Sequence, residues 1–322
     1  MRFLLDAEQR AFTGSLDAML TAADTPSVVR EWSRGEHASG RSLWSRVADA
    51  GVFALAVPEV HEGLGVRPVE LVVAFVELGR HAVPGPLVET VAAAALLSGL
   101  PDPGPAKRLL PALAAGDAMA TLAWRTPYAL DGDVAATRLA LTAEGLRLAP
   151  GHGPVRASLD PARRLTPLDP GGELLATDPP TAEALKWARL ATAAQALGVG
   201  LTLLDRTVTH VKQRTQFGVP VGSFQAVKHR LADAKVALEF ARPLLFGAAL
   251  TMDPADVAAA KVTACEAAYA AARTALQLHG AIGYTAGYDL SLWLTKARVL
   301  RTAWGGPQEC RAEVLSGGAR RW

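Results

Sequence analysis

Two long apolar-periodic segments, separated by a short run of glycine and proline, constrain the fold of this chain more than any other feature. The first covers residues 186–213 without a proline, and the second covers residues 223–249, with apolar residues at mostly three-to-four spacing. This spacing is typical of helices with one buried face. Gly218, Pro220 and Gly222 interrupt the pattern, and Ser223 stands where a helix N-cap is expected. The sequence therefore predicts two long helices joined by a tight connection.

Similar patterns predict helices through most of the chain. In the N-terminal third we expect helices near residues 43–54, 68–82 and 87–99, followed by a short helix through Arg108–Leu113. The closely spaced prolines between Pro101 and Pro105 mark a boundary, since they cannot continue a helix. In the C-terminal part we expect long helices near residues 183–213, 223–249, 253–279 and 288–303. Asp253 and Pro254 are typical of a helix start, and four long helices with short connections favour a bundle.

Between these helical parts the sequence predicts short strands. Ala118–Trp124 is an apolar run of strand length, and Leu139–Leu148 has the pattern of a hairpin that turns at 143–145. Val155–Leu159 and Glu173–Ala176 are candidates for further strands. We expect a small, mostly β domain here.

The composition excludes several classes of protein. Half of the 322 residues are hydrophobic, 20% are charged, and the formal net charge is +2. Neither a disordered chain nor a nucleic-acid-binding surface is indicated, and only Arg320 and Arg321 form a basic cluster. No apolar run is long enough for a membrane span, and the N-terminus lacks the pattern of a signal peptide. Cys265 and Cys310 provide neither a disulfide framework nor the spacing of a metal site. We expect a soluble, cytoplasmic protein without nucleic-acid or membrane partners.

Three motifs point to a particular family. Residues 214–233 combine R-x-x-F-G, F-Q and H-x-L-A-D, and residues 277–284 read Gln-Leu-His-Gly-Ala-Ile-Gly-Tyr. The N-terminal third contains Leu43-Trp44, Ala56-Val-Pro58-Glu59, Gly63-Leu-Gly65 and Glu77-Leu-Gly79-Arg80. Over residues 5–110 and 185–315, the chain resembles the acyl-CoA dehydrogenases.

The resemblance implies a mainly α fold with a small β insert. An N-terminal helical domain would cover residues 1–114, a reduced middle β-domain residues 115–182, and a C-terminal four-helix bundle residues 183–322. It also implies FAD as the cofactor, an acyl-CoA as the substrate and an electron-transfer flavoprotein as the electron acceptor.

In the family, the matching Arg, Phe, Gln and Gly residues reach across a subunit interface to the pyrophosphate and adenosine of FAD. The guanidinium forks onto phosphate oxygens, and the glycine turn lets backbone N–H groups approach the diphosphate. Gln277 and Gly280 also fit an ordinary helix end with a C-cap glycine. The positions that the resemblance assigns to FAD are Arg214, Phe217, Gln225, Gln277 and Gly280.

By contrast, the family's positions for the catalytic carboxylate lack a glutamate. The usual position is Gly305, and the alternative on the first bundle helix is Ala188. In a further subgroup motif, only the aspartate, Asp289, is kept. Glu309 is a weak candidate for a base, and it also fits a solvated glutamate at the start of a helix. The motifs by which the family's β-domain holds the flavin are absent as well, although Trp124-Arg-Thr-Pro127 is faintly similar to one of them.

This combination resembles the short subunit of heterotetrameric (α2β2) bacterial acyl-CoA dehydrogenases, notably those of steroid degradation. We therefore expect a subunit that contributes the ADP side of the FAD site, lacks the catalytic base and works with a longer dehydrogenase subunit. One alternative is a self-sufficient homo-oligomeric dehydrogenase that uses Glu309 or Asp289 as the base. Another alternative is a non-enzymatic scaffold of the same fold.

Overall fold

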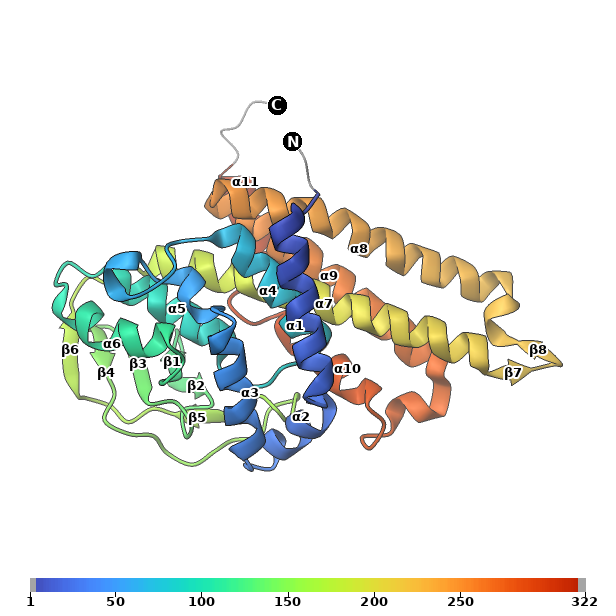
Figure 1. Cartoon of the computed structure of the whole chain (residues 1–322), viewed down its shortest axis with the longest axis horizontal. Coiled ribbons are helices and arrows are strands. Elements are labelled where there is room, and N and C mark those ends of the chain that lie inside the picture. The colour runs from blue at the N-terminus through green and yellow to red at the C-terminus, as the bar shows by residue number, and fades with distance from the viewer. Residues whose placement is uncertain (1–3, 318–322) are drawn as a thin grey trace.

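A computed structural model of the chain describes residues 4–317, so that Arg320 and Arg321 lie outside the described residues. A sheet occupies one end of the elongated molecule, and a small hairpin projects from the other, hereafter the distal end (Figure 1). One long helix, α7 (Thr181–Gln213), runs between them. At 1.5 Å per residue, this helix is about 50 Å long. The two ends of the molecule are therefore far apart.

The N-terminal third is helical, as predicted. Its α-helices are α1 (Ala7–Ala22), α2 (Thr25–Ser33), α3 (Ala38–Asp49), α4 (Pro68–Arg80), α5 (Leu87–Ser98) and α6 (Gly104–Ala114), with short 3-10 turns at Phe53–Ala56 and Glu59–His61. The helix expected at 43–54 begins earlier, at Ala38, and includes Gly40. A Cβ at Gly40 would lie 2.2 Å from the Trp32 ring, so this glycine lets α3 pack against that side chain.

The middle part contains short strands around the predicted hairpin. Within the described residues, the sheet has the order β1-β3-β4-β6, with β1 parallel to β3 and the other neighbours antiparallel. Leu139 faces Leu148 and Thr142 faces Gly145 across the turn, which confirms the predicted hairpin. The strands are β1 (Ala120–Ala123), β2 (Tyr128–Leu130), β3 (Thr137–Thr142), β4 (Gly145–Leu148), β5 (Leu165–Pro167) and β6 (Glu173–Ala176), of which β2 and β5 form a separate antiparallel pair.

The prediction of a strand at Val155–Leu159 is wrong. Only Arg156 of this segment forms a bridge, to Leu165, and Val155 and Leu159 are exposed. The alternation of apolar and polar residues fits a strand. A strand also needs an adjacent strand with which its backbone can form hydrogen bonds along its length.

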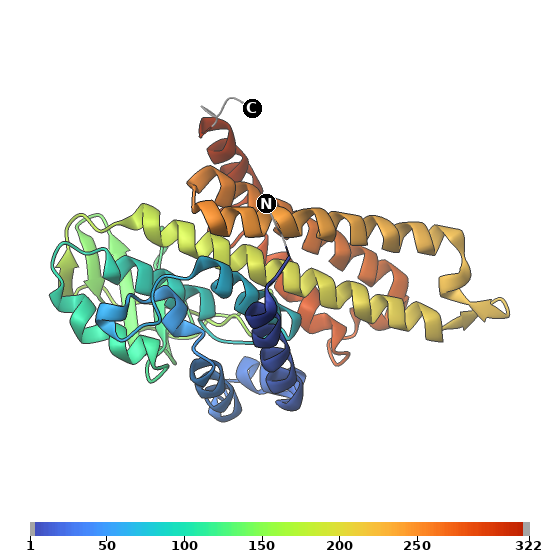
Figure 2. The same cartoon turned by 45° about the horizontal axis from the view of Figure 1, so that its top comes forward.

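The C-terminal part forms the predicted bundle. After α7 come α8 (Gln225–Thr251), α9 (Pro254–His279), α10 (Leu290–Leu300) and α11 (Pro307–Ser316). Asp253 caps α9 by accepting hydrogen bonds from the backbone N–H groups of Ala255 and Asp256, as the sequence predicted. Figures 1 and 2 show α8 along the outer edge of the bundle, and Figure 2 shows α11, the dark red helix, projecting from it.

The prediction that Ser223 caps α8 is wrong. Its hydroxyl donates to Pro220 O at 2.7 Å within a 3-10 turn, and Phe224 occupies the N-cap position without a side-chain hydrogen bond. Serine hydroxyls can bond to nearby backbone carbonyls as readily as to a helix N-terminus.

A continuous hydrophobic core joins the N-terminal helices, the sheet and the bundle. Two glycines make the contact between α4 and α7 possible. A Cβ at Gly79 would lie 2.1 Å from Gln195 O, and a Cβ at Gly198 would lie 1.9 Å from Val76 O. The two backbones therefore touch where the helices cross, which explains the glycine in the Glu77-Leu-Gly79-Arg80 motif. No helix in the described part of the chain has both the length and the apolar character needed to span a membrane.

Candidate functional site

The predicted FAD-binding residues gather at the distal end. Arg214 follows α7, Gln225 begins α8, and Gln277 lies in the last turn of α9, just before Gly280. The His210 and His279 rings, whose centroids are 4.1 Å apart, hold the ends of α7 and α9 together. Burial is the main reason that the pKa of each histidine is lowered. The rings therefore stack as neutral imidazoles, with His279 directly before Gly280 and His210 four residues before Arg214.

A hairpin carries Phe217 to the tip of the distal end. Strands β7 (Thr215–Gln216) and β8 (Val219–Pro220) pair there, and both turn residues have positive φ, 55° at Phe217 and 77° at Gly218. Two such residues form the turn that suits tight hairpins. Phe217 is 92% exposed, and its ring lies edge-on to that of Phe224, with ring centroids 6.3 Å apart. A side chain this apolar, on a backbone that favours glycine, suggests a contact surface for another molecule.

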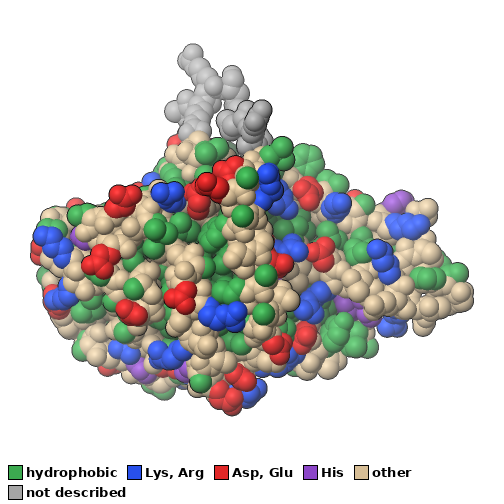
Figure 3. Space-filling view, in the orientation of Figure 1, with side chains coloured by type: hydrophobic (Ala, Val, Ile, Leu, Met, Phe, Trp, Pro, Cys, Tyr) green, Lys and Arg blue, Asp and Glu red, His purple; other side chains and the backbone are tan. Residues whose placement is uncertain are grey.

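The distal end is also strongly basic. Arg214 is exposed, and within residues 4–317 no ion pair reaches its guanidinium or the cations on the neighbouring helix ends, which are Lys212, Lys228, Arg230 and Arg273. Figure 3 shows this end with basic side chains, whereas both signs are mixed over the body. Arg230 and Arg273 line an open groove of about 460 Å³ with Gln277 and Tyr284. This unbalanced positive charge fits the phosphates of a nucleotide.

Gly280 adds a backbone feature that fits a diphosphate. Its φ of 64° and ψ of −137° lie in a region that only glycine adopts readily. A Cβ at this position would meet no atom within 4 Å, so neighbouring atoms do not explain the glycine. It ends α9 and also leaves open space over the backbone, as a close approach by phosphate oxygens requires.

The opposite end holds a cavity lined by Gly305, the position at which the resemblance places the family's catalytic carboxylate. About 320 Å³ in volume, it lies between β1, β2, α5 and the loop that joins α10 to α11. Trp124 and Trp304 face it with ring centroids 5.9 Å apart, and Gly305 and Glu309 line it. Arg125 and Trp304 both have positive φ, as does Gly305. Strained backbone of this kind concentrates at functional sites.

Two buried cations fix the loop beside this cavity. Arg189, 1% exposed, donates to Trp304 O at 3.0 Å and also binds Glu309 and Glu313. Lys261, fully buried, donates to Arg301 O at 3.0 Å and to Gly305 O. A Cβ at Gly305 would lie 3.0 Å from the Arg189 guanidinium. Because the φ of 117° at Gly305 is also strained for any other residue, a glutamate at this position would require Arg189 or the backbone to shift.

The two candidate bases are held in ion pairs. Glu309 Oε1 lies 2.9 Å from Arg125 Nη1 and 3.0 Å from Arg189 Nη2, so it is not the freely solvated glutamate that the sequence also allowed. Asp289 lies outside the cavity lining and pairs with Arg30 at 2.7 Å and Arg206 at 3.9 Å. Both carboxylates are therefore already engaged with guanidinium groups in this structure.

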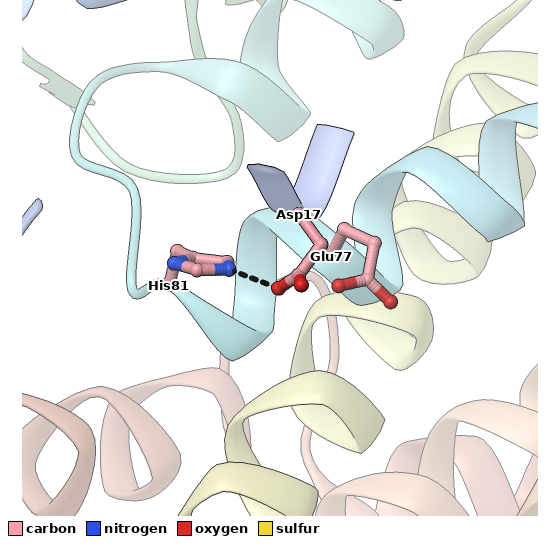
Figure 4. A group of neighbouring side chains, drawn as sticks. All are labelled: Asp17, Glu77 and His81. Carbon is pink, nitrogen blue, oxygen red and sulfur yellow. Dashed lines mark hydrogen bonds and ion pairs between the residues drawn. The ribbon is translucent and has the colours of Figure 1, made fainter. Parts of the chain in front are cut away.

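The structure also reveals a cluster that sequence patterns did not indicate. Asp17 on α1, Glu77 on α4 and His81, which directly follows α4, bring their side-chain oxygen and nitrogen atoms within 4.8 Å of one another (Figure 4). His81 Nε2 lies 2.9 Å from Asp17 Oδ1, and Arg80 Nε lies 3.7 Å from Glu77 Oε2. A histidine and an arginine thus already compensate the two carboxylates.

Comparisons with known proteins agree with this architecture. Residues 6–117 match the model of the acyl-CoA dehydrogenase N-terminal domain, and residues 181–318 match that of the C-terminal domain. Acyl-CoA dehydrogenase IpdE2 of Mycobacterium tuberculosis is 34% identical over 296 residues, which cover 90% of this chain and 91% of the relative. The IpdE2 of Mycolicibacterium smegmatis is 32% identical, with 95% and 97% covered.

Solved structures extend the likeness to the whole fold. The ChsE4-ChsE5 complex from Mycobacterium tuberculosis contains a chain with a TM-score of 0.83 at 24% identity, with both chains fully covered. The steroid acyl-CoA dehydrogenase Tcur3481-Tcur3483 has a TM-score of 0.81 at 24% identity, with 96% of this chain and 97% of the other covered. FAD, the cofactor expected from the sequence, is the cofactor of these dehydrogenases. With two domain models matched and the IpdE2 relatives aligned over nearly its full length, the chain belongs to the acyl-CoA dehydrogenase family.

Proposed function

We propose that this chain is a non-catalytic subunit of a heteromeric, FAD-dependent acyl-CoA dehydrogenase. Its distal end would bind the ADP part of a FAD whose flavin lies in a longer partner subunit. The observation that carries the proposal is the contrast between the two ends. The distal end offers an exposed Phe217 and cations that have no ion pair among residues 4–317, whereas the cavity end has Gly305 in place of a base and Glu309 bound by two arginines.

Each of the residues at the distal end would make a different contact with the nucleotide or the partner. Arg214 would donate to the diphosphate, and Gly280 would let backbone N–H groups approach it. Gln225 and Gln277 would donate amide hydrogen bonds, and Phe217 would pack against the partner at the tip of its hairpin. Bound FAD supplies the hydride acceptor for α,β-dehydrogenation of a CoA thioester.

The relatives support a heteromeric assembly. The printed names of two structural neighbours describe two-component proteins, ChsE4-ChsE5 and Tcur3481-Tcur3483, and the second is called a steroid dehydrogenase. By analogy, we propose an α2β2 assembly, a bulky steroid-derived CoA ester as substrate and an electron-transfer flavoprotein as acceptor. Fold likeness is only an associational argument for function, so the assembly requires a direct test.

The test compares the chain expressed alone with the chain co-expressed with a longer dehydrogenase subunit from the same genome. Alone, the chain is expected to hold FAD substoichiometrically. Together, the two chains are expected to give one FAD per heterodimer and to reduce it with an acyl-CoA. A stoichiometric yellow homo-oligomer that is reduced by an acyl-CoA would contradict the proposal and support the self-sufficient alternative. Absence of flavin with every partner present would support the scaffold alternative.

A further inference from the structure

His210 and His279 form a contact whose chemistry the proposed function does not use. Their rings stack with centroids 4.1 Å apart and an angle of 20° between the ring planes. Among residues 4–317, this is the only ring-to-ring contact between α7 and α9. His279 is fully buried and His210 is partly buried, so the pair is largely removed from solvent.

Each histidine is linked directly to a residue that would hold the nucleotide. The backbone N–H of Arg214 donates to His210 O at 2.9 Å, and His279 directly precedes Gly280. Gln277 lies two residues before His279, in the last turn of α9. The stack therefore fixes the spacing between the helix end that carries Arg214 and the glycine turn at Gly280.

The hydrogen bonding of the pair suits neutral rings. His279 Nδ1 lies 2.8 Å from Ala275 O, so in the neutral ring this nitrogen carries the hydrogen and donates it. The Nε2 atoms of both histidines are buried and have no hydrogen-bond partner within the described part of the chain. A proton added at His279 Nε2 would therefore be a buried donor without an acceptor. Protonation of both rings would also place two cations face to face.

The groups around the pair favour the neutral form as well. Burial lowers the pKa of each histidine, and the charges of His279 and Arg214 lower the pKa of His210 further. Tyr288, in the turn before α10, places its ring 5.8 Å from that of His279. Within residues 4–317, no carboxylate forms an ion pair with either histidine. The other titratable groups on the elements that meet here are the exposed Lys212, Lys228, His229, Arg273 and Tyr284, and Asp289, whose carboxylate is paired with Arg30 and Arg206.

Acid should therefore weaken the contact between the two helix ends. The pKa of each stacked histidine lies below its ordinary value of 6.5, so below that pH the closed contact binds fewer protons than an opened one. The stability of the contact is fully present above pH 6.5 and falls as the pH falls. Because the Nε2 atoms are buried, the added charge could not reach a phosphate while the rings stay stacked.

We propose that the stacked His210–His279 pair positions the diphosphate-binding residues and releases FAD when it is protonated in mildly acid solution. With neutral rings, α7 and α9 hold Arg214 and Gly280 at the spacing that the nucleotide requires. With a protonated ring the contact opens, and these two residues no longer face the same diphosphate. The inference rests on the proposed function, because it concerns the site at which the distal end would hold FAD.

FAD binding by the co-expressed complex, measured at about pH 7.5 and about pH 5.5, tests the proposal. We expect the dissociation constant of the parent complex to rise about tenfold or more at the lower pH, since uptake of one proton changes an equilibrium at most about tenfold per pH unit. His210→Phe keeps a planar ring for stacking and cannot take up a proton. Its dissociation constant should therefore change by less than about threefold between the two pH values.

Two further variants separate stacking from titration. His210→Ala removes the ring and should weaken FAD binding already at about pH 7.5, so that His210→Phe acts as its rescue. His229→Phe makes the same replacement at an exposed histidine on α8 and should keep the pH dependence of the parent. If His210→Phe does not fold, His210→Gln replaces it, with the same expected loss of pH dependence. An equal change in the parent and in the variant that cannot be protonated, or tighter FAD binding at the lower pH, would overturn the proposal.

Hydrogen exchange of the full chain alone distinguishes a failure of this inference from a failure of the proposed function. At about pH 5.5, residues 207–214 and 275–284 should exchange faster in the parent than in His210→Phe, and at about pH 7.5 the two should agree. Comparison at one pH cancels the intrinsic pH dependence of exchange. If the two proteins do not differ at the lower pH, the inference is wrong, whether or not the complex binds FAD. If they differ but the complex binds no FAD, the proposed function is wrong and the release of FAD is overturned with it.

Discussion

Arg214 places a positive charge at the end of α7 without an ion pair among the residues that the structure describes. In the co-expressed complex, Arg214→Ala should weaken FAD binding about ten- to a hundredfold, because a charge-assisted contact to phosphate is worth about 1.5–3 kcal/mol. Gln277→Ala should weaken it less. FAD retention during ultrafiltration measures both effects. Arg298→Ala, another exposed arginine in the last turn of a helix, is the control. If Arg214→Ala retains FAD as well as the parent, Arg214 does not bind FAD and is only a cation at the end of a helix.

The role of Glu309 distinguishes a non-catalytic subunit from a self-sufficient dehydrogenase that uses this residue as its base. Because Arg125 and Arg189 bind its carboxylate, we expect Glu309→Gln to change turnover of the complex by less than about threefold, or under 1 kcal/mol in the barrier. Removing a true general base costs about 10²–10⁴-fold. Steady-state turnover with FAD content and assembly held equal distinguishes the two cases. A loss of 10²-fold or more would indicate that Glu309 of this subunit is the catalytic base.

Some of the functional residues could be predicted from the sequence, and others could not. Phe217 and Gly280 could be singled out from motif spacing, and their exposure and positive φ are consistent with the roles expected for them. The pairing of Glu309 with Arg125 and Arg189 was missed, because the three residues lie on different segments and no local pattern brings them together.

Among the elements, the packing of α1 against α4 carries a pH-dependent contribution. Burial raises the pKa of Glu77 to about 7, against the opposing effect of Arg80. The ordinary value is 4.5, so the folded state binds more protons than the unfolded state between about pH 4.5 and 7. The stability of the protein should therefore fall as the pH rises through this range, and the loss should be complete above about pH 7.

Glu77→Gln should remove this loss, because the amide imitates the protonated carboxyl group. At pH 8 the variant should be more stable than the parent by about 2–3 kcal/mol, and the difference should shrink toward zero near pH 4.5. Urea unfolding midpoints at both pH values provide the measurement. Glu8→Gln, which alters an exposed glutamate on α1, should show no comparable pH dependence. A variant that is less stable than the parent at pH 8 would mean that the pairing with Arg80 outweighs burial.

Long helices were easier to predict than short strands, for a physical reason. Helices such as α7 and α9 have many turns over which apolar residues repeat, and Asp253 and Gly280 mark the beginning and end of α9. Strands β2 and β5 have three residues each and pair mainly with each other. Their formation depends on contacts between distant segments, so they have no reliable local signal. Ser223 failed as a cap because a carbonyl in its own turn competes for its hydroxyl.

At the scale of the whole molecule, α8 presents an apolar stripe to the outside. Val236, Phe240 and Leu244 follow one another at four-residue spacing and are 53%, 70% and 47% exposed, and Leu250 near the end of the helix is 60% exposed. The helix lies along the outer edge of the bundle in both views (Figures 1 and 2). Contiguous apolar surface of this kind is typical of protein–protein contacts. The proposed α2β2 assembly would cover it.

We therefore expect Phe240→Glu to weaken assembly while leaving the fold of the chain intact. The side chain is exposed in the single chain, so the charge would cost little there, whereas an apolar interface would have to bury an unpaired carboxylate. Light scattering coupled to size-exclusion chromatography should show the co-expressed complex dissociating to smaller species, with unchanged circular dichroism. Val60→Glu is the control, because Val60 is 81% exposed on the 3-10 turn between α3 and α4, away from α8. If Phe240→Glu assembles as the parent does, the contact between subunits lies elsewhere on the molecule, and the basic distal end with Phe217 becomes the next surface to test.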